Sequence, residues 1–138
     1  MTKRARGYLT VTALRHVAVG IVCLALPNDF KGDSYQIIIE VLPIGLWGLL
    51  FLAGGAHLGY AAVKGDERQA RIGLSLSAVS TSLWAAGFFM AYFVGGIVTL
   101  IGGILWTALT LKDLVVCAQP MRSPFERITR EYVGPQAR

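Results

Sequence analysis

The apolar residues of this chain are arranged in long unbroken runs, not in the periodic stripes of a soluble amphipathic helix. The runs cover residues 9–27, 37–63, 72–94 and 97–116. Each is close to, or longer than, the roughly 20 residues with which a helix crosses a hydrocarbon layer of about 30 Å. Because lipid offers the backbone no hydrogen-bonding partner, the runs are expected to be helices. The pattern predicts an all-α integral membrane protein, a four-helix bundle.

The turns between the runs are marked by glycine and proline. No charge separates the third run from the fourth, and residues 72–116 are too many for one span. We therefore expect a tight hairpin within "FVGGIV", at Gly95-Gly96, with Gly102-Gly103 as the alternative. Pro43 is expected to bend or loosen the start of the second helix.

Composition agrees with a membrane protein of one domain. Of the 138 residues, 54% are hydrophobic and 15% are charged, and a chain of this length cannot hide such runs in a soluble core. We divide it into a four-span domain, 1–120, and a tail, 121–138. The start, "MTKRARGYLTV", resembles a signal peptide, but Arg15 and His16 interrupt its apolar part. We expect an uncleaved first span.

The positive charges are distributed unequally between the two sides of the predicted bundle. Lys31 lies in the first loop. Before the first span are Lys3, Arg4 and Arg6, and between the second and third are Lys64, Arg68 and Arg71. At or after the end of the fourth are Lys112, Arg122, Arg127, Arg130 and Arg138. Positive loops stay in the cytoplasm, so both termini are predicted to be cytoplasmic in a multi-pass protein of the inner cell membrane. The net charge of +5 suits an anionic inner leaflet, and we expect no nucleic-acid partner.

Arg15, His16, His57 and Asp113 are ionisable residues that lie inside the runs, toward the predicted cytoplasmic side. At 1.5 Å per residue they lie within about 10 Å of the cytoplasmic ends of their helices. Intramembrane charges are costly and usually face a partner or a cavity. We predict an ion pair between Arg15 and Asp113, with His16 or His57 as a hydrogen-bonding neighbour.

This polar layer has two interpretations. It could be a proton- or ion-handling site, or a clasp that fastens the helices, with Arg15 partly reaching the headgroups. A relay would continue toward the other side of the membrane, where Glu40 is the acidic residue available. The clasp is the interpretation we favour.

The second run carries two candidate packing faces. One contains glycines at helical spacing: Gly45, Gly48, Gly55 and Gly59. Small residues let membrane helices approach closely, so this face is predicted to pack against a helix of the same chain or of a second copy. The opposite face includes Trp47, Gly54 and His57. A helix with two such faces has neighbours on both sides, either within one bundle or in a homo-oligomer.

The tail contains the signature of a short amphipathic helix at about 124–133. Ser123, Pro124 and Glu126 form a capping box and first turn, and Gly134 ends the helix. Its apolar and basic positions are Phe125, Arg127, Ile128, Arg130 and Tyr132. We expect it to lie on the inner membrane surface or to dock to a cytoplasmic or membrane protein partner.

The sequence contains no catalytic, phosphate-binding or metal-binding motif, and its two cysteines have no partner at metal or redox spacing. We expect no enzyme activity, cofactor or metal. Small size, several spans, short loops, glycine-rich faces and a basic tail resemble those of phage holins. That resemblance implies self-association in the bilayer and permeabilisation of the membrane. The alternative is a non-enzymatic membrane anchor, accessory subunit or phage exclusion protein that binds a partner through its cytoplasmic face.

Overall fold

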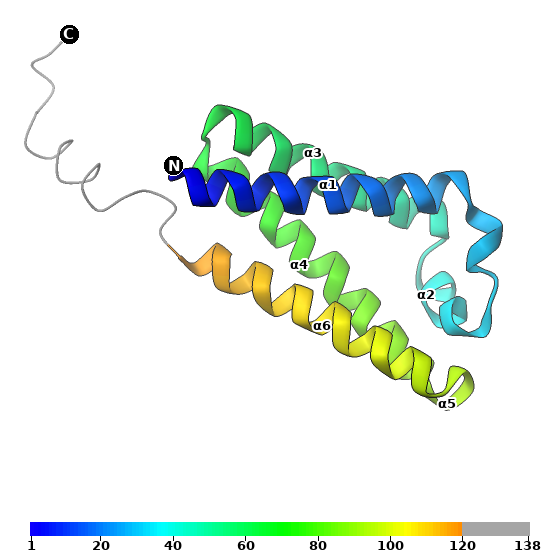
Figure 1. Ribbon diagram of the computed structural model, residues 1–138. Helices are drawn as coiled ribbons and strands as arrows, with labels where there is room; N and C mark the ends of the chain where they lie inside the picture. The colour runs from blue at the N-terminus through cyan, green and yellow to red at the C-terminus, as the bar shows by residue number, and fades with distance from the viewer. Residues whose placement is uncertain (120–138) are drawn as a thin grey trace, which may run out of the picture.

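A computed structural model describes residues 1–119, and this part of the chain is helical, without strands. Its long helices are α1 (Lys3–Ala25), α3 (Ile44–Lys64), α4 (Glu67–Met90) and α6 (Ile97–Ala118). All four are long and apolar enough to cross a membrane. Successive long helices run in opposite directions, so the first residue and the end of α6 lie at the same end of the bundle (Figure 1). The predicted all-α architecture with four candidate spans is confirmed.

Helix α1 begins before the first apolar run and ends before its last residues. The Thr2 hydroxyl accepts a hydrogen bond from the Ala5 amide and caps the helix. The basic residues Lys3, Arg4 and Arg6 therefore lie in the first turns of the helix, ahead of the predicted span 9–27. At the other end, α1 stops at Ala25 and Pro27 opens the short helix η1 (Pro27–Phe30).

The second run, predicted as one helix over 37–63, is two helices in the structure. The short helix α2 (Gln36–Val41) ends at Leu42, which is extended (φ −155°, ψ 131°), and α3 starts after Pro43. A residue before proline disfavours the helical conformation, so the chain breaks where the sequence suggested a bend. Helix α2 folds against α4, where Ile38 contacts Gly87. The Trp47 Nε1–H donates to the Ile38 carbonyl at 3.0 Å, which ties α2 to α3.

The hairpin between the last two spans lies where glycine was expected. The short helix α5 (Tyr92–Gly95) follows α4, and Gly96 has a positive φ of 66°. Gly102 and Gly103 lie within α6. The chain therefore reverses at Gly95-Gly96, because glycine adopts positive φ without steric cost.

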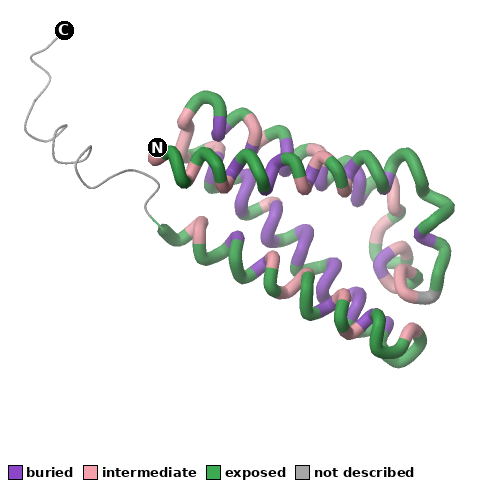
Figure 2. Tube along the Cα trace, in the orientation of Figure 1, coloured by how far each residue is buried: buried purple, intermediate pink, exposed green. Residues whose placement is uncertain are grey.

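The long helices form two antiparallel pairs, α1 with α3 and α4 with α6, joined by packing of α3 on α4. The pairs lie close at the end that holds the first residue and diverge toward the other end (Figure 1). The segment made of η1, η2 (Asp33–Tyr35) and α2 lies at the diverging end and packs against α4. Burial follows this arrangement, since buried positions face between the helices and exposed positions face outward (Figure 2).

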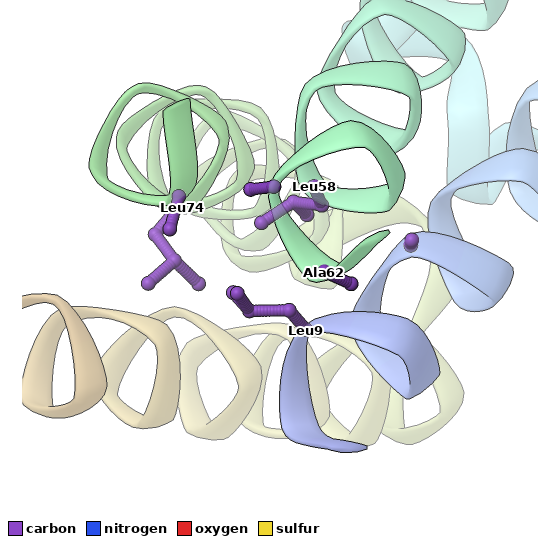
Figure 3. Packing of buried hydrophobic residues seen from close by; sticks show 7 residues of the cluster. Leu9, Leu58, Ala62 and Leu74 are labelled. Carbon is purple, nitrogen blue, oxygen red and sulfur yellow. The ribbon is translucent and has the colours of Figure 1, made fainter. Parts of the chain in front are cut away.

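Two clusters make up the core. Near the first residue, small and aliphatic side chains of α1, α3 and α4 meet, among them Leu9, Leu58, Ala62 and Leu74 (Figure 3). Toward the diverging end the core is aromatic and includes Cys23, Phe30, Ile38, Trp47, Phe51, Trp84 and Phe88. Trp84 lies centrally, with ring centroids 5.4 Å from Phe51 and 5.0 Å from Trp106. The large aromatic rings fill the space that the diverging pairs leave between them.

The glycine face of α3 packs against α1. A Cβ on Gly48 would lie 3.0 Å from the Gly20 carbonyl oxygen, and one on Gly55 would lie 3.2 Å from the Ala13 carbonyl oxygen. Gly45 and Gly59 lie at looser positions, with the nearest α1 atom 4.0 Å from such a Cβ. This face was predicted to pack against a helix of the same chain or of a second copy, and in the structure it packs against α1 of the same chain. Helix α1 covers this face most closely at Gly48 and Gly55.

Candidate functional site

The Asp113 carboxylate is the centre of a polar network inside the bundle. It lies on α6, has no exposed surface, and accepts hydrogen bonds from Tyr8 Oη, Arg15 Nη2 and Ser77 Oγ. The Arg15 bond is an ion pair of 2.9 Å. Tyr8 and Arg15 are seven positions apart on α1 and so share one face of that helix, while Ser77 comes from α4. These four residues, which we call the Asp113 network, join three helices.

The network satisfies a carboxylate that would otherwise be very costly in lipid. Arg15 Nη2 also donates to Ser77 Oγ at 3.1 Å, and Ser77 in turn donates to Asp113. The hydroxyl of Ser77 therefore acts as acceptor and donor within the same network. Charge-assisted hydrogen bonds of this kind are about twice as strong as neutral ones. The arrangement fastens α1 to the α4–α6 pair.

His16 lies beside the network without bonding to Asp113. It is 1% exposed, and its Nδ1 lies 3.0 Å from the Thr12 carbonyl oxygen, which can only accept a hydrogen bond. The Nδ1 proton is therefore donated within α1, and the 3.4 Å contact from Arg15 Nη2 is secondary. Its ring packs on Phe51 at a centroid distance of 5.3 Å, and Nε2 has no partner in the described part of the chain.

His57 does not belong to this layer, and its predicted place beside the ion pair is corrected here. Its Nδ1 lies 2.8 Å from Gln69 Oε1, across the turn between α3 and α4. The face of α3 that contacts α1 passes through Gly55, and a residue two positions further is about 200° around the helix. His57 is thereby directed to the start of α4, away from Arg15.

Sequence reasoning missed Tyr8 and Ser77. Both carried a signal in hindsight, since Tyr8 lies two turns before Arg15 on the same face and Ser77 begins a stripe of small and polar residues on the third run. Lys112, beside Asp113 in the sequence, also reaches this region. Its Nζ lies 4.8 Å from the centre of the Tyr8 ring and 3.9 Å from Asp113 Oδ1, with 42% of the side chain exposed.

The polar contacts give way to aromatic packing toward the diverging end. Thr110 donates to Thr81 Oγ1 at 2.8 Å, which links α6 to α4 beyond the Asp113 network. Past this bond the centre of the bundle is occupied by rings, including Phe51, Trp84 and Trp106. A proton relay needs polar groups in succession, and this arrangement suits a fastening better.

Residues 1–119 contain no group of three or more His, Cys, Asp or Glu side chains placed to hold a metal ion. Cys23 and Cys117 are free thiols. The predicted surface helix, with Phe125, Arg127, Ile128, Arg130 and Tyr132, lies outside the described residues.

Fold and site together define a small helical protein with four candidate membrane spans and an ion pair between the first and last of them. No protein-family model matches the chain, and it matches no curated protein and no solved structure.

Proposed function

We propose that this chain is a non-enzymatic, multi-pass anchor or accessory protein of the inner cell membrane that holds a partner at its cytoplasmic face. The observation that carries the proposal is the direction of the polar side chains in the four helices. The strongly buried ones are Thr12, His16, Ser77, Ser80, Thr81, Thr99, Thr110 and Asp113. Most of them bond within the bundle, and Thr12 Oγ1 and His16 Nε2 are buried there without a hydrogen-bond partner among residues 1–119. The polar side chains of the four helices are thus turned inward, away from the outer surface.

The outer surface of the bundle supports an anchor rather than the wall of a pore. Large apolar side chains are exposed on each long helix, for example Val11 at 67% exposure and Val98 at 69%. Subunits that line a water-filled lesion need a polar face turned toward its lumen, because water must replace lipid there. An apolar outer surface is suited to lipid.

The segments at the end of the bundle that holds the first residue supply the partner surface. They include the basic residues in the first turns of α1 and the turn between α3 and α4, and the tail with Phe125, Arg127 and Ile128 follows α6 in the sequence. With both termini in the cytoplasm, these segments gather on one side of the membrane. Their positive charge favours a partner with an acidic surface.

Holin-like permeabilisation is the second candidate. It is favoured by α6, the least buried of the four candidate spans, which packs against α4 and leaves Ile101, Ile104 and Leu105 exposed. Such a helix could associate laterally with a second copy. A homo-oligomer built in this way would have to open at the seams between its subunits.

Membrane potential separates the two candidates. The full chain is expressed in a bacterium, its insertion is measured by membrane fractionation, and the potential is followed with a voltage-sensitive dye. An anchor leaves potential and viability unchanged when the protein is well inserted. A collapse of potential at the same level of insertion would overturn the anchor and support the holin-like function. Expressing a chain truncated after residue 119 to the same level controls for overloading of the membrane.

A further inference from the structure

The first and last spans meet through side chains and not along their backbones. Helix α1 packs on α3, and α6 packs on α4, whereas α1 and α6 are joined by the bonds of Tyr8 and Arg15 to Asp113. Because Lys112 lies over the Tyr8 ring, the side of α6 that carries Lys112 faces α1. Leu109 and Val116 are on that same side, since they are three and four positions away.

The boundary between these helices is therefore a lipid-facing surface lined from both sides. We call it the α1–α6 seam and define it by the partly exposed side chains of Tyr8, Arg15 and Val19 on α1 and of Trp106, Leu109 and Lys112 on α6. The part of the seam toward the diverging end is apolar. The part near the first residue and the end of α6 is polar and cationic.

The cationic part of the seam has one positive charge that no carboxylate in the described part of the chain balances. Arg15 and Lys112 are two cations, and Asp113 is the single carboxylate within 4.0 Å of either of them in the described part of the chain. Their burial differs in a way that matters. Asp113 is fully buried, whereas the side chains of Arg15 and Lys112 are 21% and 42% exposed. The surplus charge is thus on the lipid-facing side, where it needs a counter-ion.

The height of this charge matches a phospholipid headgroup. Lys112 lies six residues before the end of α6, which is about 9 Å along the helix, and a lysine side chain can extend from there to the interface. Toward the diverging end, Trp106 of α6 and Val19 of α1 are partly buried and pack on the same aromatic cluster, and the partly buried Leu109 lies between Trp106 and Lys112 along α6. A cation at headgroup height above an apolar strip is complementary to a phosphate above an acyl chain.

We propose that the α1–α6 seam binds one anionic phospholipid, with its phosphate at Lys112 and with an acyl chain along Val19, Trp106 and Leu109. A headgroup with net negative charge neutralises the surplus charge, whereas a zwitterionic headgroup brings its own ammonium group to the same place. Basic sites between membrane helices recognise anionic lipids in this way. The inference requires that the spans lie in a bilayer and is independent of whether the protein is an anchor or a lesion-forming protein.

Tryptophan quenching tests the proposal in the intact protein. The full chain is placed in phosphatidylcholine nanodiscs that contain a small share of a lipid with brominated acyl chains. This brominated lipid is phosphatidylglycerol in one sample and phosphatidylcholine in the other. Trp106 lines the seam, whereas Trp47 and Trp84 are 1% and 3% exposed and shielded from lipid. Brominated phosphatidylglycerol is expected to quench at about fivefold lower mole fraction, a ratio that corresponds to the roughly 1 kcal/mol that one lysine gains near an anionic lipid surface.

Matched variants separate a specific site from general attraction to negative lipid. Lys112→Gln is expected to remove the preference, and Lys112→Arg to keep it. Lys64→Gln removes the same charge at the exposed end of α3 and should leave the preference intact. Equal quenching of the wild type by the two brominated lipids would overturn the proposal, whether or not the variants fold. So would an equal loss of preference in Lys112→Gln and Lys64→Gln.

Discussion

At the scale of single residues, the stability of this protein depends on how Asp113 is satisfied. Its carboxylate is fully buried and accepts three side-chain hydrogen bonds, from Tyr8, Arg15 and Ser77. A buried pair adds little over a well-packed apolar pair, but breaking it leaves an uncompensated charge. The cost of a substitution therefore depends on what charge remains.

Removing either charge of the ion pair is expected to destabilise the fold. Asp113→Asn leaves the Arg15 guanidinium without a counter-ion. Arg15→Gln leaves the Asp113 carboxylate with two neutral donors and with the more distant Lys112, at 3.9 Å, as its cation. Each should lower the free energy of unfolding by about 3 kcal/mol, the range for a broken buried pair. Thermal unfolding in detergent measures the loss.

The control and the rescue use the same chemistry. Arg71→Gln breaks the exposed pair between Arg71 and Glu67, one turn apart on α4, and should cost no more than about 0.5 kcal/mol. The exchange Arg15→Asp with Asp113→Arg should restore part of the stability, because the pair is reversed but the hydroxyl donors no longer match. Wild-type unfolding temperatures for Asp113→Asn and Arg15→Gln would exclude a stabilising ion pair.

Ser77→Ala tests the contribution of the hydroxyl. Ser77 donates to Asp113 and accepts from Arg15, so alanine removes a hydrogen bond to a buried charge. The expected cost is about 1.5–3 kcal/mol. Ser82→Ala is the matched control on the same helix, since Ser82 is exposed and bonds the Val79 carbonyl within α4. If both variants unfold at the same temperature, Ser77 has no part in the network's stability.

At the scale of elements, glycine decides how closely α1 and α3 approach. The Gly20 and Gly48 backbones are opposed, and a Cβ on either would lie within 3.0 Å of the other's carbonyl oxygen. Backbone cannot rotate away as a side chain can, so a methyl group there must push the helices apart. The glycine face is a packing surface because of two positions, Gly48 and Gly55, rather than along its whole length.

Alanine at two glycines of that one face should have opposite consequences. Gly48→Ala meets Leu24 and the Gly20 carbonyl and should cost about 1–3 kcal/mol, as overpacking does. Gly59→Ala has its nearest neighbour at 4.0 Å and should be neutral or stabilising by about 0.5–1 kcal/mol, because alanine is the better helix former. Chemical or thermal unfolding of the two variants gives the comparison. Equal effects would mean that α1 does not contact α3 as described.

At the scale of the whole molecule, the two helix pairs are joined differently at their two ends. Near the first residue they are held by the Asp113 network and small aliphatic side chains, including Leu9 and Leu58. At the diverging end, aromatic rings and the segment with α2 fill the space. Because successive long helices are antiparallel, the first residue and the end of α6 lie at the same end of the bundle.

Reporter fusions test on which side of the membrane the end of the bundle that holds the first residue lies. Green fluorescent protein fused after Arg138 is expected to fluoresce, because the chain's positive segments should stay in the cytoplasm. Alkaline phosphatase inserted after Gly32, in the loop with one lysine, is expected to be active outside the cytoplasm. A phosphatase fused after Arg138 gives the reciprocal control. Activity of that fusion, with no activity at Gly32, would reverse the orientation.

Sequence by itself determined the helical class, the four candidate spans and the turn at Gly96. Long apolar runs leave the backbone one economical conformation in lipid, and a glycine between uncharged runs marks a reversal. The pairing of Arg15 with Asp113 was predictable from depth and charge, because two buried charges of opposite sign at one height have few other partners. These inferences depend on composition and spacing along the chain.

Tertiary structure alone decided which faces meet. It directed His57 to Gln69, brought Tyr8 and Ser77 to Asp113, and turned Gly48 and Gly55 of α3 toward α1. It also broke the second run at Leu42 and folded α2 against α4. The physical reason is that the rotation of a helix about its axis depends on the packing of all its neighbours, and one helix's sequence does not contain those neighbours.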